Sequence, residues 1–313
     1  MSFLEKLARV LQKSEIEVEY FLQYAPKKYR VYKIPKRTSG FRTIAQPTKE
    51  LKEYQRAFLN IQSFPVHNTA KAYRTNVSIK DNANVHKANK YFLKMDFDNF
   101  FNSITSELFW RVCLTKFEGL TIKDKELLDK LLFWSPGKTN RRGLVLSVGA
   151  PSSPLISNFF MFEFDEVISK YCIDNNISFT RYADDLTFST NKKDILFSVP
   201  GVVKECLDAC FNKEITINKR KTVFSSKAHN RHVTGITINN SGALSLGRER
   251  KRYIKHLVHQ YTLNMLDKEK LNHLKGLLAF SMHIEPNFIK SLNEKYTLDL
   301  MNSLSGDKYD KTK

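Results

Sequence analysis

Two short acidic segments stand out in a chain that is otherwise rich in lysine and arginine. Residues 94–98 read KMDFD and residues 182–185 read YADD, each beside apolar residues typical of buried strands. The adjacent carboxylates of Asp184 and Asp185 repel one another and resist desolvation, so something positive should neutralise them. With Asp96 on a neighbouring strand, they form the donor set that two Mg²⁺ ions need to activate an attacking 3′-oxygen and stabilise a leaving pyrophosphate.

The adjacent aspartates also have a simpler interpretation. An Asp-Asp pair in a turn is most often a solvated turn, and in a chain this basic, salt bridges could neutralise both carboxylates. Only the combination of the pair with Asp96 favours a metal site over a surface turn.

The patterns around these segments indicate which elements hold them. Residues 91–96 are strand-like, and residues 179–189 indicate two short strands around a tight turn that carries the acidic pair. Residues 106–114 are expected to form a helix with Ser106 as its N-cap, and residues 154–168 a helix that begins with a proline.

The rest of the chain alternates between the same two kinds of pattern. Helical spacing of apolar residues occurs in residues 3–24, 51–61 and 200–212 and again from residue 248 onward. Residues 31–44 indicate a hairpin, and residues 215–245 several short strands. The chain is therefore predicted to be an α+β protein, with helices packed on one face of a sheet and a helical C-terminal part.

The charge of the chain indicates a polyanionic partner. Its 313 residues contain 51 Lys and Arg against 32 Asp and Glu, which gives a formal net charge of +19. We find no apolar run of about 18 residues and no secretory signal, so nucleic acid is favoured over a membrane. The four cysteines lack the spacing of a zinc finger and are interpreted as reduced thiols of a cytoplasmic protein.

The acidic segments lie within a longer series of motifs that resembles the reverse transcriptases. YADD at 182–185 resembles their Y-x-D-D signature, and Asp96 matches the first aspartate of their palm motif A. Residues 149–154 (GAPSSP) are similar to the motif B loop and residues 217–222 (INKRKT) to motif D. This resemblance implies an α+β right-hand polymerase with fingers, a palm that contains an antiparallel sheet, and a helical thumb.

Two further motifs resemble elements of the retron reverse transcriptases of bacteria. Asn82, Ala83 and His86 match their N-A-x-x-H element, and residues 233–235 match their V-T-G element. The resemblance implies that nucleic acid is bound by these two elements and by basic residues of the thumb, namely Asn82, His86, Val233, Thr234, Gly235, Arg248, Arg250 and Arg252.

The resemblance also implies roles around the metal ions. Asp96 and Asp184 would bind both Mg²⁺ ions, for which Mn²⁺ is a possible substitute, and Asp185 would be the outer carboxylate. The backbone carbonyl of Phe97 would hold the second ion. Lys221, at its motif D position, would either protonate the leaving pyrophosphate or only bind phosphate.

The incoming nucleotide would meet both the fingers and the palm. Phe101 matches the aromatic gate whose ring excludes a 2′-hydroxyl and so favours dNTP over rNTP, although a core phenylalanine is the alternative. Val148 and Gly149 lie at the motif B loop, where the family commonly has glutamine before the glycine. Valine can pack against the nucleotide but offers no amide hydrogen bond, so the way in which the nucleotide is held there is in question.

A basic segment precedes these motifs. Residues 27–42 contain seven Lys and Arg and no acidic residue, and at least four of them are expected only to meet the template backbone. Arg42 matches the arginine that clamps the triphosphate, with Lys36 as a second candidate, and an arginine suits a bidentate phosphate contact.

The resemblance predicts an RNA-directed DNA polymerase with three subdomains. These are an N-terminal extension with fingers over 1–90, a palm over 91–240 with part of the fingers in 110–147, and an RNA-binding thumb over 241–313. Retron enzymes copy a dedicated non-coding RNA into a short single-stranded DNA. They start from the 2′-hydroxyl of a guanosine, and the product is a branched RNA-DNA molecule. Retrons act in antiphage defence, so an effector protein is an expected partner.

Two other functions fit the same motifs in part. One is a group II intron-like or diversity-generating reverse transcriptase, which would lack the N-A-x-x-H and V-T-G elements. The other is an RNA-binding scaffold with a vestigial palm. The three intact aspartates at 96, 184 and 185 argue against the scaffold, since clustered carboxylates without a cation are unfavourable.

Overall fold

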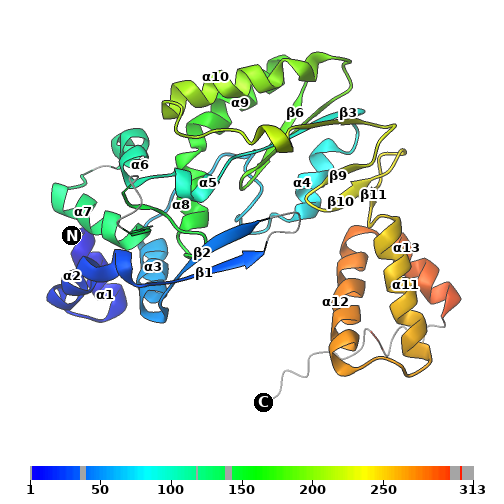
Figure 1. The fold of residues 1–313 in the computed structure, drawn as a ribbon, viewed down its shortest axis with the longest axis horizontal. Helices are drawn as coiled ribbons and strands as arrows, with labels where there is room; N and C mark the ends of the chain where they lie inside the picture. The colour runs from blue at the N-terminus through cyan, green and yellow to red at the C-terminus, as the bar shows by residue number, and fades with distance from the viewer. Residues whose placement is uncertain (1, 36–39, 118, 138–142, 297–303, 305–313) are drawn as a thin grey trace. The chain divides into compact units, whose positions relative to one another are not determined.

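The structure is a computed structural model, which describes residues 2–35, 40–117, 119–137, 143–296 and 304. The chain divides into two compact units (Figure 1). Unit 1 contains residues 1–76, 93–188 and 192–223, and unit 2 contains residues 77–92, 189–191 and 224–313. Each unit is therefore made of segments that lie apart in the sequence.

Unit 1 begins with helices whose first turns are stabilised by their own sequence. α1 (Phe3–Leu11) and α2 (Glu15–Tyr24) each start with a capping box, in which Ser2 or Ser14 accepts a hydrogen bond from the third helical amide. Both helices lie against the helices α3 (Lys49–Ile61) and α7 (Ile122–Leu132) that follow later in the chain, through buried leucine and phenylalanine side chains. The helices predicted over 3–24 and 51–61 are confirmed.

A two-stranded hairpin follows α2. β1 (Tyr29–Pro35) pairs with β2 (Phe41–Pro47) in antiparallel register, with Tyr29 opposite Pro47 and Pro35 opposite Phe41. Most of β1 is exposed, as expected for a basic ribbon with few apolar neighbours. The predicted hairpin is therefore confirmed.

The acidic segments belong to a four-stranded sheet in the order β6-β7-β3-β8. Its strands are β3 (Tyr91–Asp96), β6 (Ser178–Tyr182), β7 (Asp185–Thr190) and β8 (Val223–Ser226). β6 and β7 are joined by a two-residue turn, and β3 lies beside β7. This confirms the strand at 91–96 and the two strands around a tight turn at 179–189.

Helices with aromatic faces pack against this part of unit 1. α8 (Ser153–Phe160) and α9 (Phe162–Asp174) replace the single helix predicted over 154–168, because the backbone breaks at Met161. Together with α10 (Val199–Phe211), they bring phenylalanine rings together. Phe160 stacks on Phe211 at 4.6 Å, and Phe164 meets Phe97, the residue directly after β3, at 5.9 Å.

Shorter elements complete unit 1. The helices are α5 (Phe100–Ser103), α6 (Ser106–Cys113) and α7 (Ile122–Leu132), the two-residue strands are β4 (Phe133–Trp134) and β5 (Val145–Leu146), and the 3-10 turns are η1 (Ala25–Lys27), η2 (Leu114–Lys116), η3 (Ile195–Phe197) and η4 (Lys219–Lys221). The predicted N-cap Ser106 was wrong by one residue. Thr105 is the cap, because its extended backbone lets the hydroxyl accept from the amide of Leu108, while Ser106 donates to Asp129.

The described residues of unit 2 combine a small sheet with four helices. Its sheet has the order β11-β10-β9, and its helices α11, α12 and α13 follow one another as packed neighbours (Figure 1). The strands are β9 (Arg231–Val233), β10 (Ile236–Ile238) and β11 (Leu244–Ser245), and the helices are α4 (Ile79–His86), α11 (Arg248–Thr262), α12 (Lys268–Ile284) and α13 (Pro286–Lys295). One apolar core joins α4, the sheet and the C-terminal helices.

The two units do not coincide with the three subdomains predicted from the sequence. Unit boundaries fall at 76/77, 92/93, 188/189, 191/192 and 223/224, whereas the predicted subdomains meet at 90/91 and 240/241. Compact packing and polymerase subdomains are different divisions of a chain, so the fingers, palm and thumb boundaries stay a prediction. No helix among the described residues is both long enough and apolar enough to cross a membrane.

Candidate active site

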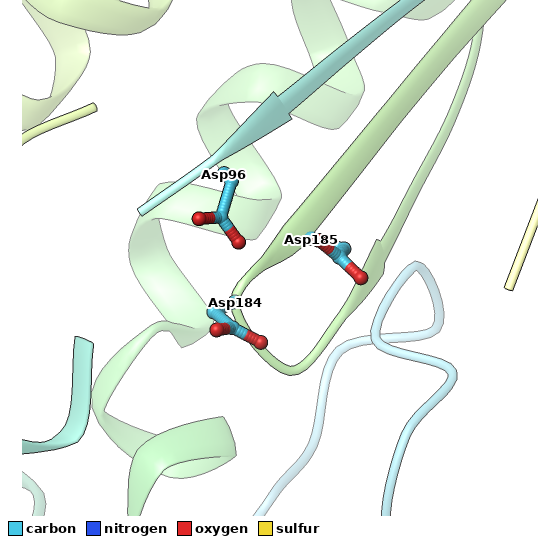
Figure 2. A group of neighbouring side chains, drawn as sticks. All are labelled: Asp96, Asp184 and Asp185. Atoms are coloured by element: carbon cyan, nitrogen blue, oxygen red, sulfur yellow. The ribbon is translucent and has the colours of Figure 1, made fainter. Parts of the chain in front are cut away.

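Three aspartates meet at one end of β3 and β7, the two central strands of the four-stranded sheet. Asp96 ends β3, while Asp184 and Asp185 lie at the turn that joins β6 to β7 (Figure 2). One carboxylate oxygen from each residue lies within 4.8 Å of the other two. Asp96 is buried, Asp184 half-buried and Asp185 exposed, so the cluster opens to solvent on one side.

Backbone hydrogen bonds fix this geometry. The amide of Phe97 donates to the carbonyl of Asp184 at 3.0 Å, and the amide of Asn218 donates to the carbonyl of Asp96 at 2.7 Å. Ala183 has a φ of 58°, a left-handed conformation that lets the turn close in two residues. The end of β3 is thus held between the acidic turn and residues 216–218.

The cluster carries more negative charge than its surroundings neutralise. Burial, and then the charge of Asp96, raise the pKa of Asp184 above its ordinary value. Restricted solvation, and then the charges of Asp184 and Asp96, raise the pKa of Asp185 to about 7. Nζ of Lys221 lies 2.5 Å from Oδ2 of Asp96, and this hydrogen bond raises the pKa of the lysine. One exposed lysine faces three carboxylates.

This donor set fits a hard divalent cation. Carboxylate oxygens are the ligands that such ions prefer, and burial together with the mutual repulsion of the carboxylates, which raise the pKa values of Asp184 and Asp185, would be relieved by a bound cation. The cluster therefore has the composition, spacing and electrostatic need of a metal centre.

The motif B loop packs directly on the basic hairpin. The amide of Ala45 on β2 donates to the carbonyl of Val148 at 3.2 Å, and Oγ of Ser147 donates to the carbonyl of Ala45. Gly149 has a φ of 128°, and a Cβ there would lie 3.3 Å from the carbonyl oxygen of Ala45. A side chain at 149 would therefore strain the backbone and press on the hairpin, which explains the glycine.

The predicted nucleotide-binding residues lie around these elements. Arg42 is exposed on β2, and its positive charge is close enough to offset part of the rise in the pKa of Asp184. Phe101 is half-exposed, whereas Phe100 is buried and stacks on Phe97 at 5.1 Å. Of the two aromatic residues, Phe101 is thus the one accessible from solvent. Lys36 lies outside the described residues.

Comparison with known proteins decides the family. A family model described as "Reverse transcriptase (RNA-dependent DNA polymerase)" matches residues 34–238. The chain is 48% identical to the Retron Ec83 reverse transcriptase of Escherichia coli over 289 residues, which cover 91% of this chain and 93% of the relative.

The chain belongs to the retron reverse transcriptases. It is also 34% identical to the Retron Ec73 reverse transcriptase of Escherichia coli over 87% of this chain and 88% of the relative. Among solved structures, a telomerase from Candida albicans aligns with 93% of this chain and 63% of its own, at 15% identity and a TM-score of 0.48. The protein is accordingly an RNA-directed DNA polymerase of the right-hand class.

The two elements that resemble retron motifs form a single structural unit in this retron reverse transcriptase. α4 carries the N-A-x-x-H residues and packs on β9, β10 and β11, where Ala83 shares a core with Val233. Oγ1 of Thr234 donates to the carbonyl of Ile79 at 3.4 Å. Residues about 150 positions apart in the sequence therefore stabilise one another.

Most of the side chains in these elements are interior. Asn82, His86 and Val233 are each at most 1% exposed, and Nδ1 of His86 lies 2.7 Å from Oγ of Ser189. Their burial argues for packing roles, and the nucleic-acid contact predicted for them stays a prediction. Gly235 is exposed.

Basic residues of the predicted thumb line a pocket at the start of α11. The pocket is lined by Arg248, Arg250 and Lys251 of the helix, by Arg231, by Glu249 and Glu285, and by neutral residues that include part of β10 and the following turn. Lys251 is paired with Glu285 at 2.5 Å, so the three arginines supply the excess of positive charge. Nη1 of Arg250 lies 3.4 Å from the carbonyl of Gly235, which joins the helix to the V-T-G element. Arg252 is exposed on α11 outside the pocket lining. The arrangement suits contact with phosphate groups.

Two residues near the carboxylates were not predicted from their motifs. Tyr73 is 51% exposed and has a φ of 59°. Burial of its hydroxyl end, followed by the charge of Asp184, raises its pKa. Lys94, two residues before Asp96 on β3, has its pKa lowered to about 8 by burial, although the charge of Asp185 opposes this. The alternation of side chains along β3 places Lys94 on the face of Asp96, a signal that the sequence contained.

Proposed function

We propose that this retron reverse transcriptase copies a dedicated non-coding RNA into a short single-stranded DNA by two-metal nucleotidyl transfer. The observation that carries the proposal is the approach of three carboxylate oxygens, from Asp96, Asp184 and Asp185, to within 4.8 Å of one another. Mg²⁺ is the proposed ion, with Mn²⁺ as a possible substitute, because both accept oxygen ligands.

Each acidic residue has a proposed place in the metal centre. Asp96 and Asp184 would hold both ions, Asp185 would be the outer carboxylate, and the carbonyl of Phe97 would complete the second site. When bound, the ions favour ionisation of the attacking hydroxyl and neutralise charge on the leaving pyrophosphate. Lys221 would bind or protonate a phosphate that arrives there, and its hydrogen bond from Nζ to Oδ2 of Asp96 supports this role.

The hairpin and the palm would together hold the incoming nucleotide. Arg42 would bind the triphosphate, and the half-exposed ring of Phe101 would exclude a ribose 2′-hydroxyl. Val148 and Gly149 lie against the hairpin that carries Arg42, so the loop and the hairpin would form one surface under the nucleotide.

The wider role follows from the family. Synthesis would start from a guanosine 2′-hydroxyl of the RNA and give a branched RNA-DNA product that stays bound. The partners would be this RNA, its DNA, dNTPs and an effector protein in antiphage defence. The cytoplasm is the proposed compartment, since all four cysteines are free thiols and the substrates are present there.

The test uses the protein with its native RNA. The chain is purified from cells that also carry its flanking genomic sequence, and the bound nucleic acid is extracted and treated separately with RNase and with DNase. A discrete DNA joined to a short RNA is the expected result. Heterogeneous DNA would indicate another kind of reverse transcriptase, and RNA alone would indicate a scaffold.

Variants of the acidic turn complete the test. The double variant Asp184→Asn with Asp185→Asn should contain no DNA while it still retains RNA, since the substitutions leave unit 2 unchanged. A matched control is Asp208→Asn, an aspartate of α10 paired with Lys204 at 2.8 Å, which should make DNA normally. Continued DNA synthesis by the double variant would overturn the assignment.

A further inference from the structure

A buried ion pair lies directly behind the acidic turn. Arg181 lies three residues before Asp184 in the sequence and is completely inaccessible to solvent, as is Asp165 on α9. Nε of Arg181 donates to Oδ1 of Asp165 at 2.8 Å, and Nη2 donates to Oδ2 at 2.6 Å. Buried pairs of this kind contribute little net stability compared with apolar residues of similar size, so stability alone does not account for it.

The remaining nitrogen of the guanidinium reaches the catalytic turn itself. Nη1 of Arg181 donates to the carbonyl of Ala183 at 3.1 Å, and the carbonyl of Asp184 accepts from the amide of Phe97 at 3.0 Å. The peptide groups on both sides of Asp184 are therefore hydrogen bonded. Since these two planes determine where the Cα–Cβ bond of Asp184 points, the direction of its carboxylate depends on Arg181.

The same network holds a second segment beside the turn. Nη1 of Arg181 also donates to Oδ1 of Asn158 on α8 at 3.1 Å, and Nδ2 of Asn158 donates to the carbonyl of Ala72 at 3.0 Å. The backbone of Arg181 adds two bonds, to Thr69 at 2.9 Å and from Lys71 at 2.8 Å.

These contacts fix the backbone immediately before Tyr73. That tyrosine has a left-handed backbone, and its exposed side chain is influenced by the charge of Asp184. A strained conformation of a bulky residue persists only where its surroundings enforce it. Asn158 and Arg181 supply that enforcement from inside the protein.

We propose that Arg181, Asp165 and Asn158 are positioning residues that aim Asp184 at the metal ions and fix the backbone that leads into Tyr73. The inference rests on the metal-dependent part of the proposed function. Asp165 orients the guanidinium by its bidentate contact, Arg181 fixes the turn, and Asn158 transmits the position of Arg181 to the segment that precedes Tyr73. None of the three contacts substrate in this role.

The test compares two variants that damage the network to different degrees. Arg181→Lys keeps a positive charge beside Asp165 but cannot make the bidentate contact and reach Asn158 and Ala183 together. Asn158→Ala keeps the ion pair and removes the link to Ala72. Each is measured in RNA-templated primer extension for kcat, the KM for dNTP and the Mg²⁺ concentration at half-maximal rate.

We expect both variants to lose rate through a weaker metal centre. Arg181→Lys should lower kcat about 10- to 100-fold, because a displacement of the order of 1 Å has effects of that size. The half-maximal Mg²⁺ concentration should rise at least about threefold, since Mg²⁺ demands near-ideal geometry. Asn158→Ala should show the same changes to a smaller extent, and the KM for dNTP should change by less than about twofold in both.

A readout without catalysis separates positioning from chemistry. The rise in melting temperature on addition of Mg²⁺ or Mn²⁺ should be smaller in both variants than in the unaltered protein, because the carboxylates bind the ion less well.

Two control substitutions remove interior contacts outside the network. Asn175→Ala removes an amide that donates to the carbonyl of Tyr171 at 2.9 Å on α9, and Leu207→Ala removes a buried side chain from α10.

The controls should lose stability without a change in Mg²⁺ dependence. If Arg181→Lys is folded and keeps the unaltered kcat and Mg²⁺ dependence, the proposal is wrong. If Arg181→Lys does not fold, Asn158→Ala decides the question by the same measurements. If Asp184→Asn polymerises normally, the proposed metal centre itself fails. Loss of activity in Asp184→Asn together with normal behaviour of both network variants would reject only the positioning role.

Discussion

Among the described residues, each unit has one arginine that is at most 1% exposed, and these two arginines have different kinds of partner. In unit 1, Arg181 pairs with the buried carboxylate of Asp165. In unit 2, Arg231 donates to two backbone carbonyls, those of Asn89 at 2.6 Å and Asn239 at 2.5 Å, and burial lowers its pKa. The first charge is neutralised inside the fold, whereas the second relies on neutral dipoles.

The charged side chains at the predicted sites of the two units also differ. Three carboxylates crowd together in unit 1, with one exposed lysine among them. The pocket of unit 2 is lined by Arg231, Arg248, Arg250 and Lys251, with Glu249 and Glu285 among them, so positive charge exceeds negative charge there. The first region is therefore proposed to hold a cation and the second to contact phosphate. We therefore expect substitutions in the acidic cluster of unit 1 to impair catalysis and substitutions in the pocket of unit 2 to impair nucleic-acid binding.

The largest effect is expected at the acidic cluster. Asp184→Asn should lower kcat by at least about 10³-fold, because several kcal/mol of charge stabilisation depend on the metal centre. Retention of RNA should be unchanged, since the basic pocket is intact. Primer extension and filter binding on the same preparation measure the two quantities. A parallel loss of RNA binding would contradict the separation of roles.

A second effect is expected in the choice of sugar. Phe101→Ala should lower the preference for dNTP over rNTP about 10- to 100-fold, because the steric exclusion of the 2′-hydroxyl is lost. The ratio of kcat/KM for dGTP and rGTP measures it. Phe100→Leu is the control, since Phe100 is buried against Phe97 and its replacement should alter stability but not the ratio. An unchanged ratio in Phe101→Ala would return Phe101 to a packing role.

A smaller effect is expected at the basic pocket. Combined Arg248→Ala and Arg250→Ala should weaken RNA binding about tenfold and reduce the slope of log K against log salt by about 1 to 2, because phosphate contacts are lost. At saturating template, kcat should stay constant. Lys204→Ala removes an exposed lysine of unit 1 and should leave the slope unchanged. A loss of kcat at saturating template would show that the pocket acts on catalysis.

Local features of the fold were predictable from the sequence, and distant ones were not. The hairpin at 31–44 and the strands around the acidic turn follow from alternating apolar residues and turn chemistry within a few positions. The meeting of the three aspartates at 96, 184 and 185 was predictable because the motifs of the family specify it. The division into units was not, because α4 shares its core with residues beyond 224, and such pairing leaves no local pattern.

The positioning network was missed for a related physical reason. Arg181 and Asp165 are charged residues that are rarely buried completely, so a sequence pattern assigns them to the surface. Their interior place depends on bonds to Asn158 and to backbone carbonyls, which only a folded chain brings together. Asn82 and His86 are predicted to meet nucleic acid from their match to the N-A-x-x-H element, and although both lie in the interior, that contact stays a prediction.

The smallest effect expected is on the pH dependence of folding stability, and its direction follows from the raised pKa values of Asp184 and Asp185. With its pKa raised to about 7, Asp185 binds a proton more readily in the folded chain than in the unfolded one, and the pKa of Asp184 is raised as well. This contribution to stability is fully present below the unfolded value near 4 and is lost as the pH rises to about 7. Without metal, the protein should therefore lose stability between pH 4 and pH 7 through these two residues, and Asp185→Asn should lose less.

Divalent cation should reverse that trend. Because bound Mg²⁺ stabilises the ionised carboxylates, the rise in melting temperature on its addition should be greater at pH 8 than at pH 5.5, by about 1–3 °C. Thermal unfolding at both pH values, with and without Mg²⁺, measures this. The control Asp208→Asn lies outside the cluster and should keep the difference, whereas Asp185→Asn should reduce it. An equal Mg²⁺ effect at both pH values would mean that another cation, such as the ammonium of Lys221, already neutralises the three carboxylates. The acidic cluster of unit 1 would then not need a metal ion, and the proposed difference in charge between the sites of the two units would be wrong.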